Sequence, residues 1–237
     1  MSAVDHVYKA LKSKILAQEY LPGAQLKEMQ ISRELAATRT PVREAIIRLE
    51  REGLVRTVYN RGAFVTVFSP EEIEDLFEVR EALEAKALAL AIRRANRDEV
   101  DSIERALRRR ELRIKSLAIK QSFDDPELDF HLAIIRLSKN ERLISIWQAM
   151  QSQLSLVRVT STMRKRRYLK ALDEHKKILA FMRGGDTTKA VRLLIRHLAC
   201  ARNNLLSSLA DGADAPRTGK PHRETGEKGH TEIQANM

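Results

Sequence analysis

The stretch TRTPVREAIIRLEREGLV, residues 38–55, decides the fold of the N-terminal part of this chain. It is typical of one amphipathic helix. Thr38 or Thr40 can cap the N-terminus, and Pro41 suits the first helical position because its missing N–H would be unpaired there anyway. Gly53 supplies the C-terminal stop. The spacing of the apolar residues predicts a buried stripe, formed by Val42, Ala45, Ile46 and Leu49.

Arginines at the start of this helix indicate contact with DNA. Arg39 and Arg43 stand on or beside the first turn, where the side chains of a recognition helix reach base edges and phosphates. An ordinary surface helix with scattered charge would show the same pattern. The flanking sequence therefore has to decide between the two interpretations.

Two further helices are expected before this stretch. Apolar residues recur at a helical period from Val4 to Tyr20, and Leu21-Pro22-Gly23 then breaks the pattern. A second, short helix is expected from about Lys27 to Ala36. A tight turn at Ala37-Thr38 leads from it into the arginine-bearing helix, an order typical of a helix-turn-helix.

A hairpin signal follows. Val55–Tyr59 and Ala63–Val67 are rich in β-branched residues, and Asn60-Arg61-Gly62 between them suits the positive φ angles of a tight turn. Helices followed by a hairpin predict a winged helix-turn-helix. Arg61 would lie at the wing tip, placed to touch a phosphate or to enter the minor groove.

These residues also carry a family resemblance. Residues 7–67 resemble the N-terminal domain of the GntR family of bacterial transcription regulators. Two departures lie at the turn, where Ala36 replaces the usual Gly and Thr38 the commoner Ser. The matching segments have fixed mutual spacing: 22–26, 39–45, Leu49, 53–55 and 61–65. The DNA contacts expected from the helix and the wing come from Arg39, Thr40, Arg43, Arg61 and Gly62.

Composition agrees with an anionic partner but does not identify one. The chain has 237 residues, enough for about two domains, and a formal charge of +11. Residues 1–68 carry 11 Lys and Arg against 7 Asp and Glu, whereas residues 69–209 carry 28 against 20. Most of the excess thus lies outside the winged domain, in runs such as 108–110 and 164–167. Such runs are usually solvated faces, and assistance to DNA binding is the alternative.

Other features narrow the class of protein. Cys200 is the only cysteine, so the chain cannot form an intramolecular disulfide. Because it lies near the end of an apolar helix, it is expected to be a small core residue. The N-terminus shows no export signal, and no apolar run approaches the roughly 18 residues of a membrane span. A cytoplasmic protein is expected. Residues 210–237 lack periodicity and predict a disordered tail.

The second domain, residues 69–209, is expected to be an all-α bundle. Ser69-Pro70 opens it with a capping residue and a proline in the first turn, followed by acids. No strand pattern interrupts the helical period, so the whole protein is mainly α. Such a bundle can hold a ligand or metal between facing helices. Six helices are predicted, over about 70–95, 97–120, 125–138, 141–160, 166–184 and 186–209.

Three histidines and a carboxylate make a metal site conceivable in this bundle. Glu127 and His131 are four residues apart and project from one helix face, while His175 and His197 lie on later helices. This set suits a divalent ion such as zinc, nickel or manganese. On spacing alone, however, a histidine on a helix is more often an ordinary buried or solvated residue.

A second resemblance bears on that choice. Residues 70–209 look like the FCD effector domain of FadR-type GntR regulators. The matching segments are 77–84, 130–131, 174–178, 185–186 and 196–198, together with Asn140. The resemblance implies that three histidines and an Asp bind the metal; here Glu127 stands at the Asp position. Arg80 matches a recurrent arginine and could clamp a carboxylate ligand. Its alternative is an ion pair with Glu84 or Glu78.

Together these features predict a homodimeric, ligand-responsive transcription regulator, more a repressor than an activator, that binds a palindromic operator. The resemblance implies that its ligand is a small organic acid. Two rivals differ in class. One is a metal-dependent, hydrolase-like enzyme, although the sequence offers no further general base in a catalytic motif. The other is a non-specific architectural DNA-binding protein, which would show little preference for a palindrome. We expect the chain not to be an enzyme.

Overall fold

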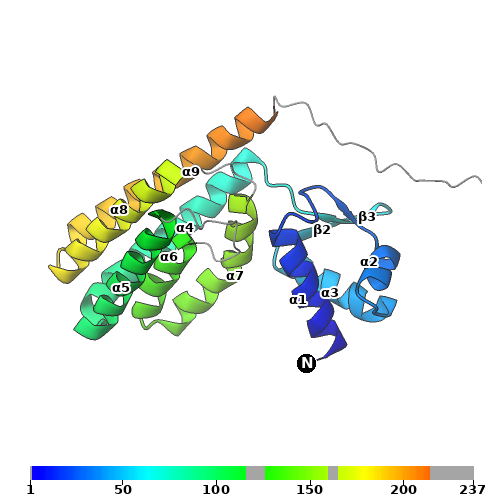
Figure 1. Ribbon diagram of the computed structural model, residues 1–237, viewed down its shortest axis with the longest axis horizontal. Coiled ribbons are helices and arrows are strands. Elements are labelled where there is room, and N and C mark those ends of the chain that lie inside the picture. The colour runs from blue at the N-terminus through cyan, green and yellow to red at the C-terminus, as the bar shows by residue number, and fades with distance from the viewer. Residues whose placement is uncertain (1, 116–125, 160–164, 214–237) are drawn as a thin grey trace, which may run out of the picture.

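The computed structural model describes residues 2–115, 126–159 and 165–213. Figure 1 shows two parts, a small winged domain and an all-helical domain, joined by the segment before α4. The predictions of a winged helix-turn-helix, from the hairpin signal, and of an all-α bundle, from the helical period, are therefore confirmed. Within the described residues, no helix is both long and apolar enough to span a membrane.

The winged domain combines three helices with a three-stranded antiparallel sheet of order β1-β3-β2. Strand β1 was not expected from the sequence, because its two residues are too few to show a period. The first helix was expected to run to Tyr20. It ends earlier, because Gln18 adopts a left-handed φ of 59°. The elements are α1 (Ala3–Leu16), β1 (Gln25–Leu26), α2 (Glu28–Glu34), α3 (Arg39–Arg51), β2 (Val55–Val58) and β3 (Gly62–Val65).

Helix α3 begins and ends by local chemistry. Thr38 is the N-cap residue, but its side chain makes no capping hydrogen bond. Pro41 is the third helical residue and not the first, which costs no hydrogen bond because N–H groups of the first turn lack intrahelical partners. At the other end Gly53 has a φ of 73°, and the Leu54 N–H donates to the Leu49 carbonyl. This is a Schellman cap.

The two tight turns use left-handed residues. Ala36 has a φ of 47° where the related pattern has glycine, so the turn forms at the cost of backbone strain. Asn60, with a φ of 56°, and Gly62 shape the wing, and the Arg61 N–H closes its turn on the Val58 carbonyl. The expected stripe of α3 is buried, at Val42, Ala45, Ile46 and Leu49.

The helical domain begins with the expected capping residue, Ser69, which forms a capping box with Glu72: each side chain accepts a hydrogen bond from the other's backbone N–H. The last helix runs to Ala213, past the expected end at 209, while the rest of the expected tail lies outside the described residues. The part of the helix expected over 97–120 that follows Lys115 also lies outside them. The helices are α4 (Pro70–Arg94), α5 (Arg97–Lys115), α6 (Pro126–Leu137), α7 (Glu141–Val159), α8 (Lys165–Arg183) and α9 (Thr187–Ala213).

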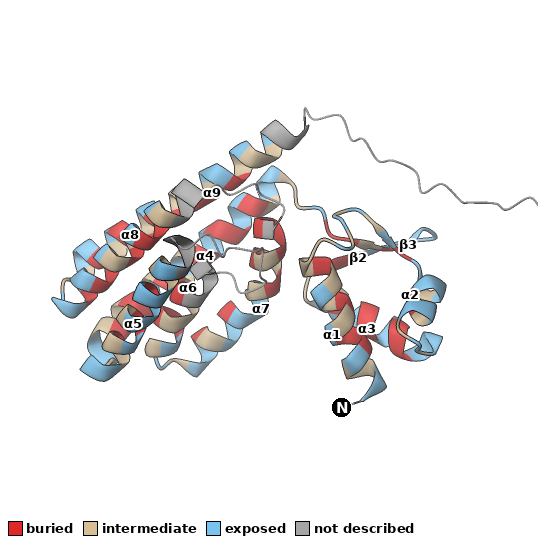
Figure 2. Ribbon diagram, viewed as in Figure 1, coloured by how far each residue is buried: buried red, intermediate tan, exposed pale blue. Residues whose placement is uncertain are grey.

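Apolar residues form a core in each domain, and Figure 2 shows buried residues on the inward sides of the helices. An apolar side chain of the helical domain also belongs to the core of the winged domain. Leu156 of α7 is 1 % exposed and packs within the core of the winged domain, among residues of α1, α3 and the sheet. Cys200 is only partly buried, so the expectation of a core cysteine was wrong.

Candidate functional site

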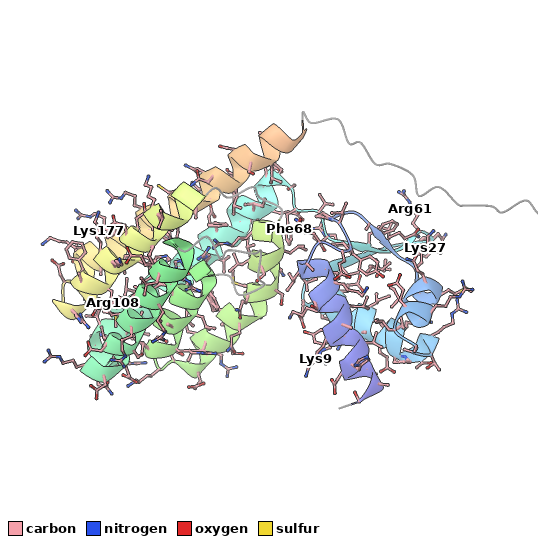
Figure 3. The ribbon with its side chains drawn as sticks, in the orientation of Figure 1. Lys9, Lys27, Arg61, Phe68, Arg108 and Lys177 are labelled. Atoms are coloured by element: carbon pink, nitrogen blue, oxygen red, sulfur yellow. The ribbon has the colours of Figure 1, made fainter. Side chains whose placement is uncertain are left out.

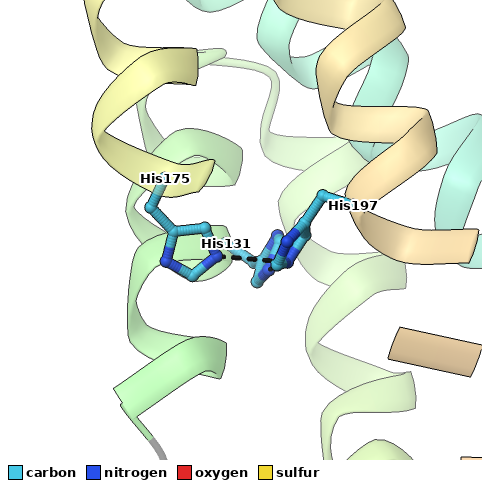
Figure 4. A group of neighbouring side chains, drawn as sticks. All are labelled: His131, His175 and His197. Atoms are coloured by element: carbon cyan, nitrogen blue, oxygen red, sulfur yellow. Dashed lines mark hydrogen bonds between the residues drawn. The ribbon is translucent and has the colours of Figure 1, made fainter. Parts of the chain in front are cut away.

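The three histidines meet at the centre of the helical domain. His131 comes from α6, His175 from α8 and His197 from α9, and each is at most 2 % exposed. Nε2 of His197 lies 3.2 Å from Nε2 of His175 and 3.3 Å from Nε2 of His131 (Figure 4). Helices distant in sequence thus bring three imidazole nitrogens to one point.

Two carboxylates orient the rings of His131 and His197 by contacting their Nδ1 atoms. Nδ1 of His131 lies 2.5 Å from Oε2 of Glu84, and Nδ1 of His197 lies 2.7 Å from Oε2 of Glu174. When each Nδ1–H donates to its carboxylate, each Nε2 presents a lone pair to the centre, as in carboxylate–histidine–metal triads. Phe130 stacks on the His175 ring with the centroids 4.0 Å apart and fixes its plane.

Burial keeps the imidazoles of His131 and His175 neutral. It is the main reason that the pKa of His131 falls to about 4, with Glu84 opposing the shift and Arg80 adding to it. Burial also lowers the pKa of His175 well below its usual value, helped by the positive charges of neighbouring groups that include Arg158. Neutral rings can give their lone pairs to a cation at pH 7.

The spacing of the nitrogens fits a metal ion. Zn–N bonds of about 2.0–2.1 Å in tetrahedral geometry place two ligand nitrogens about 3.3–3.4 Å apart. The observed separations of 3.2 and 3.3 Å agree with this value. Among the described side chains the cluster consists of histidines alone. Glu127 lies one turn before His131 on α6, and its side chain is outside the described residues.

Arg80 lies beside this centre and is 1 % exposed. Its Nε donates to Oε1 of Glu84 at 2.7 Å, so the ion pair with Glu84 considered from the sequence is present. Its two terminal nitrogens are buried and have no hydrogen-bond partner in the described part of the chain. Burial alone would raise the pKa of Glu84, but Arg80 and His131 hold it below its usual range.

The DNA-contact candidates lie on the surface of the winged domain. Arg39, Thr40 and Arg43 are exposed in the first turns of α3, and Arg61 and Gly62 are exposed at the wing. Figure 3 shows Arg61 at the side of the winged domain away from the helical bundle. Gln25 supports the wing by donating from Nε2 to the Arg61 carbonyl at 2.7 Å.

Sequence reasoning missed the residues that support the site. Glu84 was considered only as a partner of Arg80, and Glu174 only as a neighbour of His175 in a matching segment. Their hydrogen bonds to histidines come from helices far apart in sequence, so spacing gave no signal.

The basic run at 108–110 lies on α5, where Arg108 pairs with Glu104. The second run, 164–167, has no described side chains.

Comparison with known proteins assigns the class. The model of bacterial regulatory proteins of the gntR family matches residues 3–65, and the FCD domain model matches residues 75–199, more than half of the chain. The chain therefore belongs to the GntR family of bacterial transcription regulators and carries an FCD domain. Proteins of this family bind DNA.

Individual relatives agree with this assignment. The Uxu operon transcriptional regulator of Escherichia coli is 29% identical, over 83% of this chain and 84% of its own. The probable D-xylose utilization operon transcriptional repressor of Paenarthrobacter nicotinovorans is 26% identical, over 78% and 80%. A solved GntR regulator structure from Rhodococcus sp. RHA1 has the same fold, with a TM-score of 0.73 and 24% identity over 88% of this chain and 99% of that one.

Proposed function

We propose that this protein is a homodimeric repressor whose DNA binding responds to a small organic acid held at a metal in the helical domain. The observation that carries the proposal is the convergence of three buried histidine nitrogens beside an arginine with two unpartnered buried nitrogens. A relative of similar length carries the name of a repressor, which supports the sign of regulation. A two-fold dimer requires a two-fold operator.

On the DNA side, the first turns of α3 would enter the major groove. Arg39 and Arg43 would supply base and phosphate contacts, and Thr40 a phosphate contact. Arg61 and Gly62 at the wing would contact the neighbouring backbone or minor groove. The exposure of all five residues on the winged domain supports this assignment.

On the ligand side, His131, His175 and His197 would hold a divalent ion such as zinc, nickel or manganese. Glu127 would add an oxygen ligand from the preceding turn of α6. The bound metal would supply a Lewis-acid site that attracts an anionic oxygen of the effector. Arg80 would hold the effector carboxylate with the two terminal nitrogens that Glu84 does not occupy.

Operator binding tests the DNA assignment. A binding site is first selected from random duplex DNA with the full chain and then footprinted, and a palindrome is expected. Arg43→Ala should abolish binding in a gel-shift assay without changing helical content. Arg51→Ala, an exposed arginine at the other end of α3, is the matched control and should retain binding. Unchanged affinity in Arg43→Ala would show that α3 is not the recognition helix.

Elemental analysis tests the metal assignment. The native chain should contain one divalent ion per protomer, and His175→Ala should lose it. His6→Ala removes an exposed histidine far from the site and should keep the metal. Equal metal content in the native chain and His175→Ala would remove His175 from the ligand set.

A thermal-shift screen tests the effector class. A carboxylic acid that binds the native state raises the melting temperature, and at about 100 times its Kd it adds about 2.7 kcal/mol of stability. The shift should be reduced in Arg80→Lys, which keeps the charge but loses the planar fork of donors. A full-size shift in a folded, metal-bound Arg80→Lys protein would exclude Arg80 as the carboxylate clamp.

A further inference from the structure

Helix α7 lies between the two domains and packs against each with a different face. In Figure 1 it is the helix of the bundle nearest to α1. Trp147, Leu154 and Val157 belong to a core cluster of the helical domain. Ser152 and Leu156 instead contact the winged domain. A single rigid helix therefore touches both cores.

At the winged domain, α7 meets the end of the recognition helix. The Ser152 hydroxyl donates to Oε2 of Glu52 at 2.9 Å, and Glu52 is the C-cap residue of α3. Tyr8 and Lys12 of α1 hold the same carboxylate at 2.5 and 2.6 Å. Because the ring of Tyr8 also stacks on the Arg48 guanidinium of α3, with 3.9 Å between them, this carboxylate ties α7, α1 and α3 together.

The carboxylate of Glu52 is charged in this arrangement. Its partial burial alone would raise its pKa, but Lys12, Tyr8 and Ser152 hold the pKa below the usual range. A charged, partly buried carboxylate with three donors has a well-defined position. A shift of Ser152 would therefore disturb the contacts of the carboxylate at the C-terminal end of α3.

At the other end, α7 meets the histidine centre. Nε1–H of Trp147 donates to Oε1 of Glu84 at 3.2 Å. The same carboxylate accepts from Arg80 at 2.7 Å and pairs with His131 at 2.5 Å. All of these groups are buried, so water cannot replace a lost partner without cost. A change at His131 or Arg80 thus acts directly on the hydrogen bond that positions Trp147.

We propose that α7 couples the histidine centre to the recognition helix, from Glu84 and Trp147 at one end to Ser152 and Glu52 at the other. This inference rests on the proposed function, because it takes the histidine centre as the ligand site. Ser152 comes five positions after Trp147, a rise of about 7.5 Å along one helix. Occupancy of the centre shifts α7, and α7 shifts α3 relative to the helical domain.

Hydrogen exchange of the full chain, followed by mass spectrometry, tests the coupling at residues 49–56. Two perturbations act at the centre: zinc against a chelator in the native chain, and Glu84→Gln in the metal-free chain. Each should change exchange in this segment by about threefold or more. Leu194→Ala, which alters a core cluster that contains no α7 residue, is the control and should leave the segment unchanged.

Two further variants break the connection. Trp147→Phe removes the donor at the centre, and Ser152→Ala removes the donor at Glu52. Both should keep the native zinc content and lose the zinc response at residues 49–56. Ser155→Ala on the same helix is the matched control and should keep the response.

The outcomes separate the coupling from the proposed function. An undiminished zinc response in both Trp147→Phe and Ser152→Ala would overturn the coupling. So would native exchange at residues 49–56 in Glu84→Gln. Zinc content and operator binding are measured on the same preparations. A native chain without zinc would refute the metal site alone, because the comparison of Glu84→Gln with the native chain still decides the coupling.

Discussion

Lowering the pH from 7 to 4.5 in the presence of a chelator should destabilise the helical domain, because His131 is buried in its neutral form. The pKa of its imidazole is about 4 in the fold and 6.5 when unperturbed. Between about pH 6.5 and 4 the imidazole of His131 binds a proton in the unfolded chain but not in the native chain. The contribution of His131 to stability is therefore complete above pH 6.5 and is lost as the pH falls through about 4.

The size of the effect follows from these two pKa values. One pKa unit corresponds to about 1.4 kcal/mol, so protonation of the unfolded state costs about 2 kcal/mol of stability between pH 7 and 4.5. His175, whose pKa is also lowered, adds to the loss. Glu84 contributes little in this window, because its pKa is lowered and its stabilisation is lost only at more acid pH.

Urea unfolding followed by tryptophan fluorescence measures this loss. Trp147 is the only tryptophan and lies in the helical domain, so the signal reports on that domain. A loss of about 2 kcal/mol should lower the urea midpoint by about 1 M. His131→Gln should remove its own share of the loss, about 2 kcal/mol, whereas His6→Gln, at an exposed position, should keep the full pH dependence. Equal pH dependence in the native chain and His131→Gln would refute the argument.

Three further predictions concern stability and metal affinity. Ala36→Gly should stabilise the winged domain by about 0.5–1 kcal/mol, seen as a higher melting temperature, because it relieves the left-handed alanine. Glu174→Gln should weaken zinc about 10–100-fold in a chelator competition, because the His197 ring loses its orienting carboxylate. Leu156→Ala should destabilise the winged domain by about 2–4 kcal/mol, measured by hydrogen exchange of α1 and α3, whereas Leu154→Ala should spare it.

The winged domain could be predicted from sequence because its determinants are local. The apolar stripe of α3, Gly53 at its end and Asn60 in the wing each act within a few residues. Two details escaped prediction. Gln18 ends α1 early in a left-handed conformation that its residue type does not signal, and Gln25–Leu26 is too short a strand to show alternation.

The histidine centre could be predicted only in part. The sequence supplied three histidines on helices, and the family resemblance grouped them, but their convergence depends on how α6, α8 and α9 pack. The roles of Glu84 and Glu174 depend on which atom faces which, and residue spacing does not encode that. The contact of α7 with both domains could not be predicted from sequence either. Leu156 fits the helical period of α7, so nothing in the sequence indicated that it packs against the other domain.

The position of Leu156 also bears on how this protein is made. The winged domain leaves the ribosome before α7 exists, and at about 5–20 residues per second it waits several seconds for the side chain that completes its core. Until then the core cluster of the winged domain lacks one of its buried apolar side chains. A winged domain grafted onto another regulator would lack that side chain permanently, unless a residue equivalent to Leu156 were transferred with it.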